Sequence, residues 1–294
     1  MKKIRVLAIV LSVMMCIGLF AACSANDTPP APPVTPGTNG NEENNTAQDS
    51  DMAYILGNGE MVIGYTVYEP MNYTDDAGNF TGFDTEFAIA VCEKLGVEPK
   101  FVEINWDTKE TELAAKSIDC IWNGMTINPS RATEMSISFP YVKNAQVIIV
   151  KADSTVTSTA DLIGKTVVAE VGSAGEMQII GTDEEDPEEN LAQATYVPMA
   201  KQTDCLLEVK SGTADAAVLD WTLAKTMVGE GTSFTDLMMV ADLQLAEEEY
   251  GIAFRRGSDV TEAVNEIILE LVADGTMHDL ADKYGLIISP VIEK

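Results

Sequence analysis

Short apolar runs alternate with helical apolar stripes in the chain beyond residue 60. Residues 61–65 form an apolar run that predicts a strand. Phe83, Phe87 and Val91 then recur at helical spacing, and Gly96 predicts the end of that helix. The same patterns predict a strand, a helix and a strand at 97–104, 109–116 and 118–122. This βαβαβ order is typical of a parallel sheet covered by helices.

A second unit of the same kind follows the first. Its strands and helices are predicted at 166–171, 174–180, 194–197, 203–210 and 214–219. The two units end alike, with Ser117-Ile118-Asp119-Cys120-Ile121 in the first and Thr213-Ala214-Asp215-Ala216-Ala217 in the second. A strand at 250–254 and a helix with an apolar stripe at 264–272 remain after the second unit.

Two units of this size predict two lobes, because each is close to the common size of a domain. The last strand and helix are too small to fold alone, so we expect them to return to the first lobe. The sequence therefore predicts an α/β fold in which each lobe is a mixed sheet flanked by helices. Lobe 1 is expected at 52–143 plus 250–294 and lobe 2 at 144–249, joined by a hinge with two chain crossings.

The first 22 residues have the pattern of an export signal. Basic residues precede an apolar run at 6–20, and Ala21-Ala22 lead to Cys23. The run is shorter than the ~20 apolar residues of a spanning helix, which favours a signal peptide over a membrane span. The junction resembles a bacterial lipobox, whose cysteine carries a diacylglyceryl group, although Phe20 stands where leucine is usual. An ordinary signal peptide with an incidental cysteine is the alternative.

Residues 23–51 predict a disordered tether. They are rich in proline, glycine and asparagine and nearly lack large apolar side chains, so they cannot bury enough surface to fold. We therefore expect the folded part to be held at the extracytoplasmic face of the cell membrane by a lipid on Cys23, or else to be periplasmic.

The charge of the chain excludes two classes of partner. The chain has 47 Asp and Glu against 18 Lys and Arg, a formal net charge of −29. Such a charge repels phosphate groups, so we expect no nucleic acid partner and no membrane contact other than the N-terminal lipid.

Cysteine and histidine give no metal pattern. Cys92, Cys120 and Cys205 remain after the signal and Cys23, and their spacing fits no metal site. Buried free thiols are the favoured interpretation, with a Cys92–Cys120 disulfide as the alternative. His278 is the single histidine. We expect no metal, no cofactor and no catalytic residue.

Residues suited to bind charged groups of a ligand follow three predicted strands, at the carboxyl ends where α/β sheets bind ligands. Asn128 is a good N-cap and Pro129 suits the first helical position, which places Arg131 in a first turn. A guanidinium there invites a carboxylate, although a solvated surface arginine is an equally natural alternative.

The other two strand ends supply a turn and an acid. Gly172-Ser173-Ala174-Gly175 opens a helix whose free N–H groups favour an anion, although a plain structural turn is the commoner meaning. Asp220 either holds an ammonium group or caps the next helix. Together the three sites match a zwitterionic amino acid. Candidate pocket walls are Tyr65, Tyr68, Tyr73 and Trp106.

Residues Gly82-Phe83-Asp84-Thr85-Glu86-Phe87-Ala88-Ile89-Ala90-Val91-Cys92 resemble the signature of bacterial extracellular solute-binding proteins of family 3. The likeness continues through Trp106, 122–124, Thr126, Arg131, 139–141, 161–165, 171–173, 212–216 and 274–276, and covers about residues 58–287. These proteins serve ABC importers of polar amino acids. The resemblance therefore implies a two-lobed type II periplasmic-binding-protein fold that closes on its ligand by hinge motion.

The resemblance also implies roles for individual residues. Arg131 pairs with the ligand α-carboxylate, Asp220 takes the α-ammonium, and Tyr68 and Trp106 line the side-chain pocket. The implied ligand-binding set is Tyr68, Trp106, Asn123, Gly124, Met125, Thr126, Arg131, Gly172, Ser173, Ala174 and Asp220. Relatives that bind cationic side chains often carry an acid at the position of Tyr65, so a tyrosine there weakens the case for lysine or arginine.

The expected function is capture of an amino acid or close analogue, lobe closure, and delivery to the membrane permease of an ABC importer, by a monomer. An enzyme on the same scaffold is one alternative, because some relatives dehydrate prephenate or arogenate. A binder of a non-amino-acid solute and a sensor lobe of a receptor are the others.

Overall fold

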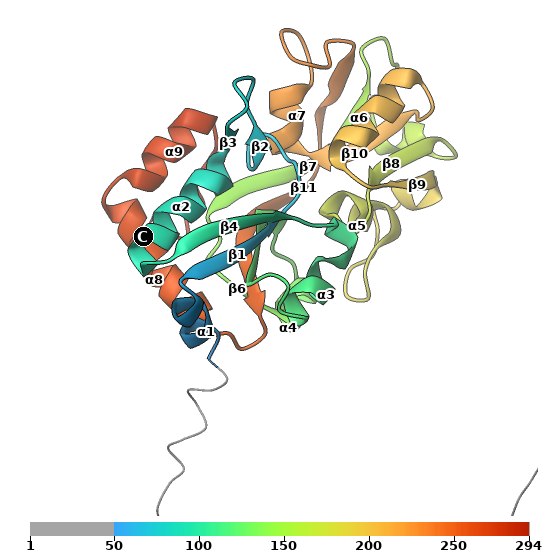
Figure 1. Cartoon of the computed structure of the whole chain (residues 1–294). Helices are drawn as coiled ribbons and strands as arrows, with labels where there is room; N and C mark the ends of the chain where they lie inside the picture. Colours follow the sequence, from blue (N-terminus) through green and yellow to red (C-terminus); the bar gives the residue numbers. More distant parts are fainter. Residues whose placement is uncertain (1–49, 294) are drawn as a thin grey trace, which may run out of the picture. The chain divides into compact units, whose positions relative to one another are not determined.

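The computed structural model describes residues 50–293, and its main feature is one continuous mixed sheet (Figure 1). The strands in the order of their pairing are β4-β1-β5-β11-β7-β10-β8-β9, and β6 also pairs with β11. A separate small ribbon is formed by β2 and β3. The predicted α/β fold class is confirmed.

The strands and helices have the following bounds. The strands are β1 (Glu60–Tyr65), β2 (Tyr73–Thr74), β3 (Phe80–Thr81), β4 (Glu98–Glu103), β5 (Cys120–Thr126), β6 (Met135–Ile137), β7 (Val142–Lys151), β8 (Thr166–Glu170), β9 (Thr195–Met199), β10 (Ala216–Asp220) and β11 (Leu237–Arg255). The α-helices are α1 (Asp51–Asn58), α2 (Phe83–Leu95), α3 (Lys109–Ala114), α4 (Pro129–Glu134), α5 (Ala174–Ile180), α6 (Gln202–Ser211), α7 (Trp221–Met227), α8 (Val260–Ala273) and α9 (Thr276–Tyr284). Three short 3₁₀ helices are η1 (Trp106–Thr108), η2 (Thr159–Leu162) and η3 (Leu191–Gln193).

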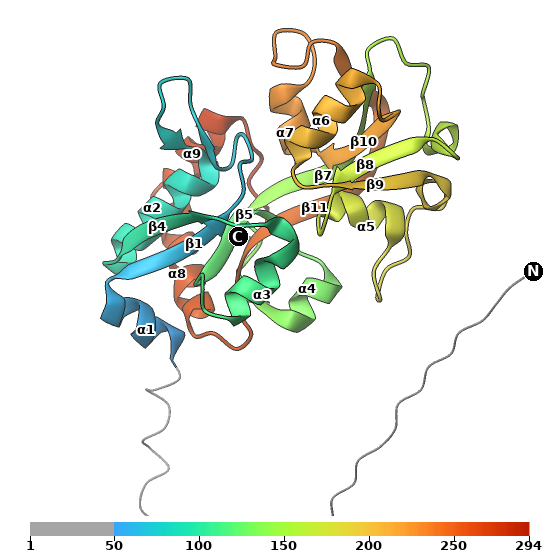
Figure 2. The ribbon, with the colours of Figure 1, turned by 45° about the vertical axis from the view of Figure 1, so that its right-hand side comes forward.

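Two parallel groups of strands are joined by two long antiparallel strands (Figure 2). In the first group β1 pairs in parallel with β4 and β5, and in the second β8 pairs in parallel with β9 and β10. Between them β7 and β11 run antiparallel to each other, β11 also pairs with β5, and β7 also pairs with β10. We call the first group with α2, α3, α4, α8 and α9 the first half, and the second group with α5, α6 and α7 the second half.

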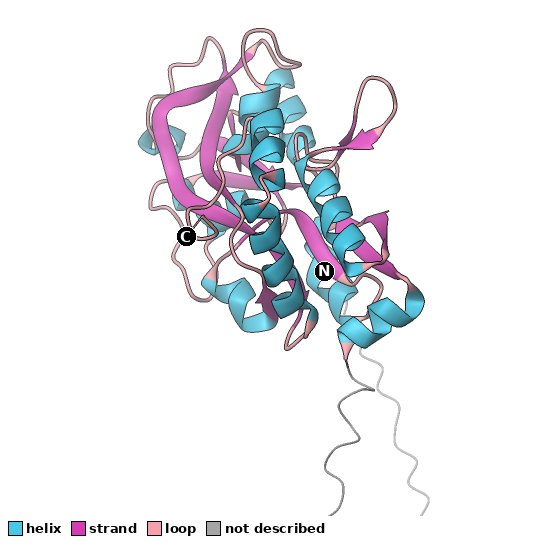
Figure 3. Cartoon of the chain, turned by 90° about the vertical axis from the view of Figure 1, so that its left-hand side faces the viewer, coloured by secondary structure: helices cyan, strands magenta, loops and turns pink. Residues whose placement is uncertain are grey.

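Helices cover both faces of the sheet, which explains why β5 and β10 are buried along their whole length (Figure 3). All five residues of β10 are buried. Its alternate residues Ala217 and Leu219 join the largest apolar cluster, whereas Ala216 and Val218 join a second cluster on the opposite face. The β5 strand divides in the same way, with Trp122 on one face and Met125 on the other.

Helix α2 carries the predicted apolar stripe and ends before Gly96, as the sequence predicts. Phe83, Phe87 and Val91 are fully buried on its apolar face. Gly96 follows it with a φ of 73° and donates to the carbonyls of Cys92 and Glu93, a conformation that favours glycine. The three described cysteines, Cys92, Cys120 and Cys205, are buried and free, which confirms the prediction of buried thiols.

The long strands differ most from the sequence prediction. The predicted strand at 250–254 is the last part of β11, which already begins at Leu237. The acidic segment Glu247-Glu248-Glu249 interrupts the apolar pattern from which a strand is predicted. The segment is held in the sheet by pairing with β7 rather than by apolar side chains.

The helix α1 begins at Asp51, the last residue of the expected tether. Within residues 50–293, no helix has the length and apolar character needed to cross a membrane.

A buried ion cluster fixes α1 to the end of the sheet. Arg255 at the end of β11 pairs with Asp51 of α1 at 2.9 Å and with Asp119 before β5 at 3.2 Å. A third guanidinium bond, of 2.8 Å, goes to the carbonyl of Ile118. Both carboxylates are more than 90% buried. Removal of the arginine leaves Asp119 without a cation among the described residues, whereas Asp51 keeps only the more exposed Lys116, at 3.5 Å.

We expect Arg255→Met to lower the free energy of unfolding by about 3–5 kcal/mol, the usual cost of leaving a buried charge unpaired. Arg256→Met is the control, because Arg256 is exposed and is expected to change stability by less than about 0.5 kcal/mol. Urea unfolding followed by circular dichroism measures both. Equal stability of the two variants would contradict the importance of this cluster.

Candidate functional site

A small cavity collects polar side chains from both halves of the sheet. The first half contributes Thr66, Tyr68, Trp106, Asn123, Gly124, Thr126 and Arg131, and the second half contributes Glu170, Ser173, Ala174, Gln202 and Asp220. The cavity volume is about 10 Å³, close to the space for one water molecule. A ligand the size of an amino acid therefore needs the surrounding groups to move apart.

Most of the predicted binding residues line this cavity. The exceptions are Met125 and Gly172. Met125 is fully buried in the apolar cluster on the other face of β5, because successive side chains of a strand point to opposite faces. Tyr65 is not among the lining residues either, and its ring packs 4.7 Å from that of Phe80.

Arg131 is a buried cation without a carboxylate partner among the described residues. It lies in the first turn of α4, where Asn128 caps the helix by accepting from the Arg131 backbone N–H at 2.8 Å. The guanidinium is 3% exposed and donates to the carbonyls of Thr126 at 2.7 Å and Gly172 at 2.9 Å. Its Nε has no acceptor among the described residues. The alternative of a solvated surface arginine is wrong.

Gly172 contributes its carbonyl to this corner of the cavity. The carbonyl accepts from both Arg131 and Lys109, whereas the Gly172 N–H donates to Glu176 at 2.6 Å. Its φ of +72° favours glycine, and a side chain would come within 3.2 Å of the Lys109 Nζ. In this structure the Gly172 N–H is thus occupied, and Ser173 caps α5 by accepting from Glu176 at 3.1 Å.

The peptide of Gly124 is fixed by a buried acid. The Gly124 N–H donates to Asp84 Oδ2 at 2.6 Å, and the Tyr141 hydroxyl donates to the same oxygen at 3.0 Å. A side chain at Gly124 would come within 2.8 Å of the ring of Tyr68. Asp84 belongs to the α2 sequence that carries the family resemblance, and its structural role is to orient the strand end that lines the cavity.

Asn123 also has a structural role. Its amide donates to the carbonyl of Thr66 at 2.8 Å and to Asn72 Oδ1 at 2.7 Å, and its oxygen accepts from the Thr66 hydroxyl at 2.7 Å. These bonds tie the end of β5 to the segment after β1. The side chain of Asn123 therefore holds the cavity wall in position.

Two aromatic residues form walls as predicted. Tyr68 is 4% exposed, and its hydroxyl lies 2.6 Å from that of Tyr250. Trp106, the first residue of η1, is 6% exposed and lies under the ammonium of Lys109, 4.9 Å from the ring centre. Burial, followed by the charge of Arg131, lowers the pKa of Lys109 to about 8.

Asp220 is a buried carboxylate that is held by amides. Asn144 and Gln146 on β7 each donate to its Oδ1 at 2.7 Å, and Gln202 donates to its Oδ2. Asp220 occupies the N-cap position of α7, as the alternative predicts, but its side chain makes no cap bond to the helix. The amides Asn144 and Gln146 also donate to Glu248 on β11, whose pKa is raised by burial and by the neighbouring Asp220.

Sequence reasoning missed Glu170, Gln202 and Thr66. Glu170 is the last residue of β8 and an acid in an otherwise apolar strand, and the rule that ligands bind at strand ends gives a signal for it. Gln202 begins α6, and only the packing of that helix brings its amide to Asp220.

The single histidine does not line the small cavity. His278 is on α9, half exposed and 3.5 Å from Glu293. Among residues 50–293, no cluster of His, Cys, Asp and Glu side chains is suited to hold a metal ion.

Known proteins resemble this chain over most of its length. Residues 61–287 match the family "Bacterial extracellular solute-binding proteins, family 3". The arginine-binding extracellular protein ArtP of Bacillus subtilis is 29% identical over 78% of this chain and 87% of its own. The L-cystine-binding protein TcyJ of Escherichia coli K12 is 29% identical over 77% of this chain and 82% of its own.

A solved structure supports the same relationship. The crystal structure of a mutant of ArgBP from T. maritima is 33% identical, with a TM-score of 0.71, and the match covers 80% of this chain and 98% of that protein. This chain belongs to family 3 of the bacterial extracellular solute-binding proteins. The predicted type II periplasmic-binding fold is confirmed.

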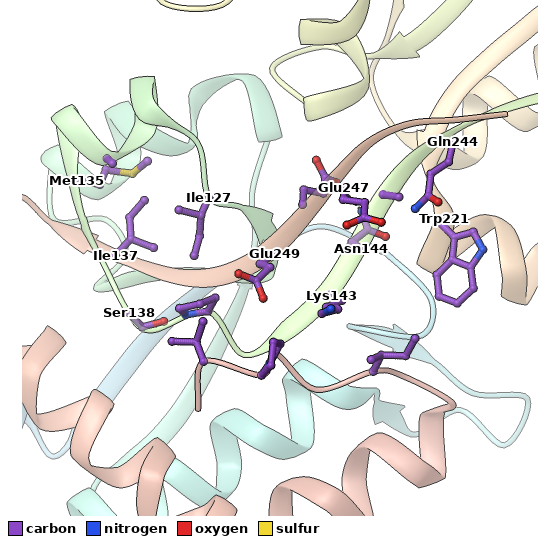
Figure 4. A pocket seen from close by; sticks show the side chains of 17 residues that line it. Ile127, Met135, Ile137, Ser138, Lys143, Asn144, Trp221, Gln244, Glu247 and Glu249 are labelled. Atoms are coloured by element: carbon purple, nitrogen blue, oxygen red, sulfur yellow. Dashed lines mark hydrogen bonds between the residues drawn. The ribbon is translucent and has the colours of Figure 1, made fainter. Parts of the chain in front are cut away.

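This solute-binding protein has a second, larger pocket along the two long strands (Figure 4). Its volume is about 1150 Å³, and its walls include Asn144, Trp221, Glu247, Glu248 and Glu249. The single cation in its lining is the exposed Lys143. Several carboxylates facing one exposed lysine do not complement a zwitterion, so the small cavity remains the candidate site.

Asp84 gives the fold a dependence on pH. Burial raises its pKa from 3.8 to about 7, although hydrogen bonds from Gly124 and Tyr141 act in the opposite direction. The folded state therefore binds this proton more tightly than the unfolded state does. The stability from protonated Asp84 is complete below about pH 4 and is lost as the pH rises through about 7.

We expect the free energy of unfolding of the ligand-free protein to fall between pH 5 and pH 8, and to fall less steeply in Asp84→Asn. Urea unfolding at several pH values measures the slope. Asp153→Asn, which changes an exposed acid, is expected to keep the wild-type slope. The same slope in wild type and Asp84→Asn would contradict the prediction.

Proposed function

We propose that this protein captures an amino acid outside the cytoplasm and delivers it to the permease of an ABC importer. The observation that carries the proposal is the position of Arg131 and Asp220, a buried cation and a buried anion that face one cavity. Neither forms an ion pair with a described residue. A free amino acid supplies the two missing charges, a carboxylate for Arg131 and an ammonium for Asp220.

The position of the two groups supports binding by closure. Arg131 belongs to the first half and Asp220 to the second, so a zwitterion meets both only when the halves come together. We propose that the halves are lobes with the boundaries 52–143 plus 250–294 and 144–249. The hinge then lies in β7 and β11, the two long strands that join the parallel groups.

The hinge strands also reach the ammonium site. Asn144 and Gln146 of β7 each donate to Glu248 of β11 and to Asp220. A ligand ammonium that replaces the Gln202 bond to Asp220 thus contacts a network anchored in both hinge strands. We propose that this contact couples binding to the closed arrangement.

The related proteins support an amino acid as the ligand. ArtP is named for arginine and TcyJ for cystine, two amino acids with unlike side chains. What the two ligands share is the α-carboxylate and the α-ammonium. This common part is what Arg131 and Asp220 complement.

A thermal-shift screen against the twenty amino acids and cystine tests the function. We expect at least one to raise the melting temperature by mass action. Arg131→Ala and Asp220→Ala are each expected to weaken its binding by at least about tenfold, since a charged hydrogen bond contributes about 1.5–3 kcal/mol. Arg256→Ala is the control and is expected to bind like wild type. No shift with any amino acid would overturn the proposal.

We propose that the protein is a binder and not an enzyme. One observation favours the alternative of a dehydratase on the same scaffold, because Glu170 is a buried acid with a raised pKa and a general acid needs this property. Turnover of prephenate or arogenate by the wild type, absent in Glu170→Gln, would establish the enzyme instead.

We also propose that the protein is a monomer anchored by a lipid on Cys23, which lies outside the described residues, as do the expected signal peptide and all but the last two residues of the tether. The lipobox-like junction supports this localisation. We expect Cys23→Ser to move the protein from the membrane fraction to the soluble fraction, because a lipid anchor is its only predicted membrane contact. Cys205→Ser, which changes a buried thiol, is the control and is expected to stay with the membrane. Membrane retention of Cys23→Ser would contradict the anchor.

A further inference from the structure

Glu170 is a buried acid without a hydrogen-bond partner for its Oε1 among the described residues. It is the last residue of β8, is 4% exposed and lines the small cavity. A buried carboxyl group without a partner is unfavourable in either protonation state. The ionised form loses its solvation by water, and the protonated form lacks hydrogen bonds.

The cations near Glu170 are already committed to other groups. The ammonium of Lys109 bonds Glu110 and the carbonyls of Trp106 and Gly172, which uses its three protons. Lys201, just before α6, pairs with Glu103 at 2.7 Å. Neither forms an ion pair with Glu170 within the described part of the chain.

The charges that act on Glu170 come from several elements. They are Asp220 on β10, Lys109 on α3, Asp204 on α6 and Lys201 before α6. Burial and the negative charge of Asp220 raise the pKa of Glu170 to about 8, although Lys109 opposes the shift. The acid is therefore mostly protonated at pH 7, and a cation beside it would favour its ionised form.

The cavity presents one more acid than a neutral amino acid can complement. Arg131 matches the α-carboxylate and Asp220 matches the α-ammonium, and Glu170 then remains unmatched. A second positive charge on the ligand supplies the partner that the described chain does not.

We propose that Glu170 binds a cationic group on the side chain of the captured amino acid, so that the ligand is a basic amino acid. The inference rests on the proposed function of amino-acid capture and names the class of ligand. It replaces the expectation that a tyrosine at position 65 disfavours lysine or arginine. Tyr65 packs with Phe80 outside the cavity lining, and the acid comes from β8 instead.

Two matched pairs of ligands test the subsite. L-citrulline has nearly the shape of L-arginine without its charge, and L-norleucine is an uncharged counterpart of L-lysine. Isothermal titration of the purified protein is expected to give at least a tenfold preference for the cation in one pair. In Glu170→Gln, which keeps the size of the side chain, that preference is expected to fall at least tenfold.

Glu189→Gln is the control, because it removes one exposed acid from the same half and is expected to keep the wild-type preference. A second measurement needs only the wild type. Titration at pH 7 in buffers of different ionisation enthalpy is expected to show that the cationic ligand releases more protons than its neutral counterpart, by up to about one per site.

The outcomes separate this inference from the proposed function. Binding of amino acids without a cationic preference, or a preference that Glu170→Gln leaves intact, overturns the role of Glu170 and leaves amino-acid capture standing. Equal proton release within a pair at pH 7 likewise overturns it. Failure of every amino acid to bind overturns the proposed function itself.

Discussion

Three buried ionisable groups face one small cavity without an ion-pair partner in the described chain. They are Arg131 on the first half, and Asp220 and Glu170 on the second. Burying such groups without partners lowers the stability of the protein, and a ligand with the opposite charges offsets this cost when it binds. The surrounding structure fixes the position of two of the three groups. Asn128 and the Thr126 carbonyl position Arg131, and the amides of Asn144 and Gln146 position Asp220.

The topology of the sheet explains why these groups meet. The two parallel groups run in opposite directions across the sheet, because β5 pairs antiparallel with β11, β11 with β7, and β7 with β10. The carboxyl ends of β5, β8 and β10 therefore point toward the boundary between the halves, and each of these strands ends in a segment that lines the cavity. Because β7 and β11 run between the parallel groups, they are the strands of the proposed hinge, and β7 also carries two of the amides that hold Asp220. In the proposed closure, one hydrogen-bonded network therefore links ligand contact to lobe position.

Local patterns in the sequence predicted much of this architecture. The stripe of Phe83, Phe87 and Val91 and the glycine at 96 predicted α2 and its end, because the helical period and the cap are properties of neighbouring positions. Asn128 and Pro129 likewise predicted the start of α4 and the place of Arg131 in its first turn. The long strand β11 was predicted only in its last part, because its acidic segment lacks the apolar pattern of a strand.

By itself, the sequence determined the order of strands and helices, the family, and the positions of Arg131 and Asp220 at strand and helix ends. Only the tertiary structure decided which side chains lack partners. Met125 points away from the cavity because of the alternation of β5, and Gln202 enters it because of the way α6 packs. Only the tertiary structure likewise shows that Glu170 is buried and that its Oε1 lacks a hydrogen-bond partner among the described residues. Whether a buried acid is satisfied depends on donors distant in sequence, such as those of Lys109, which already bond Glu110, Trp106 and Gly172.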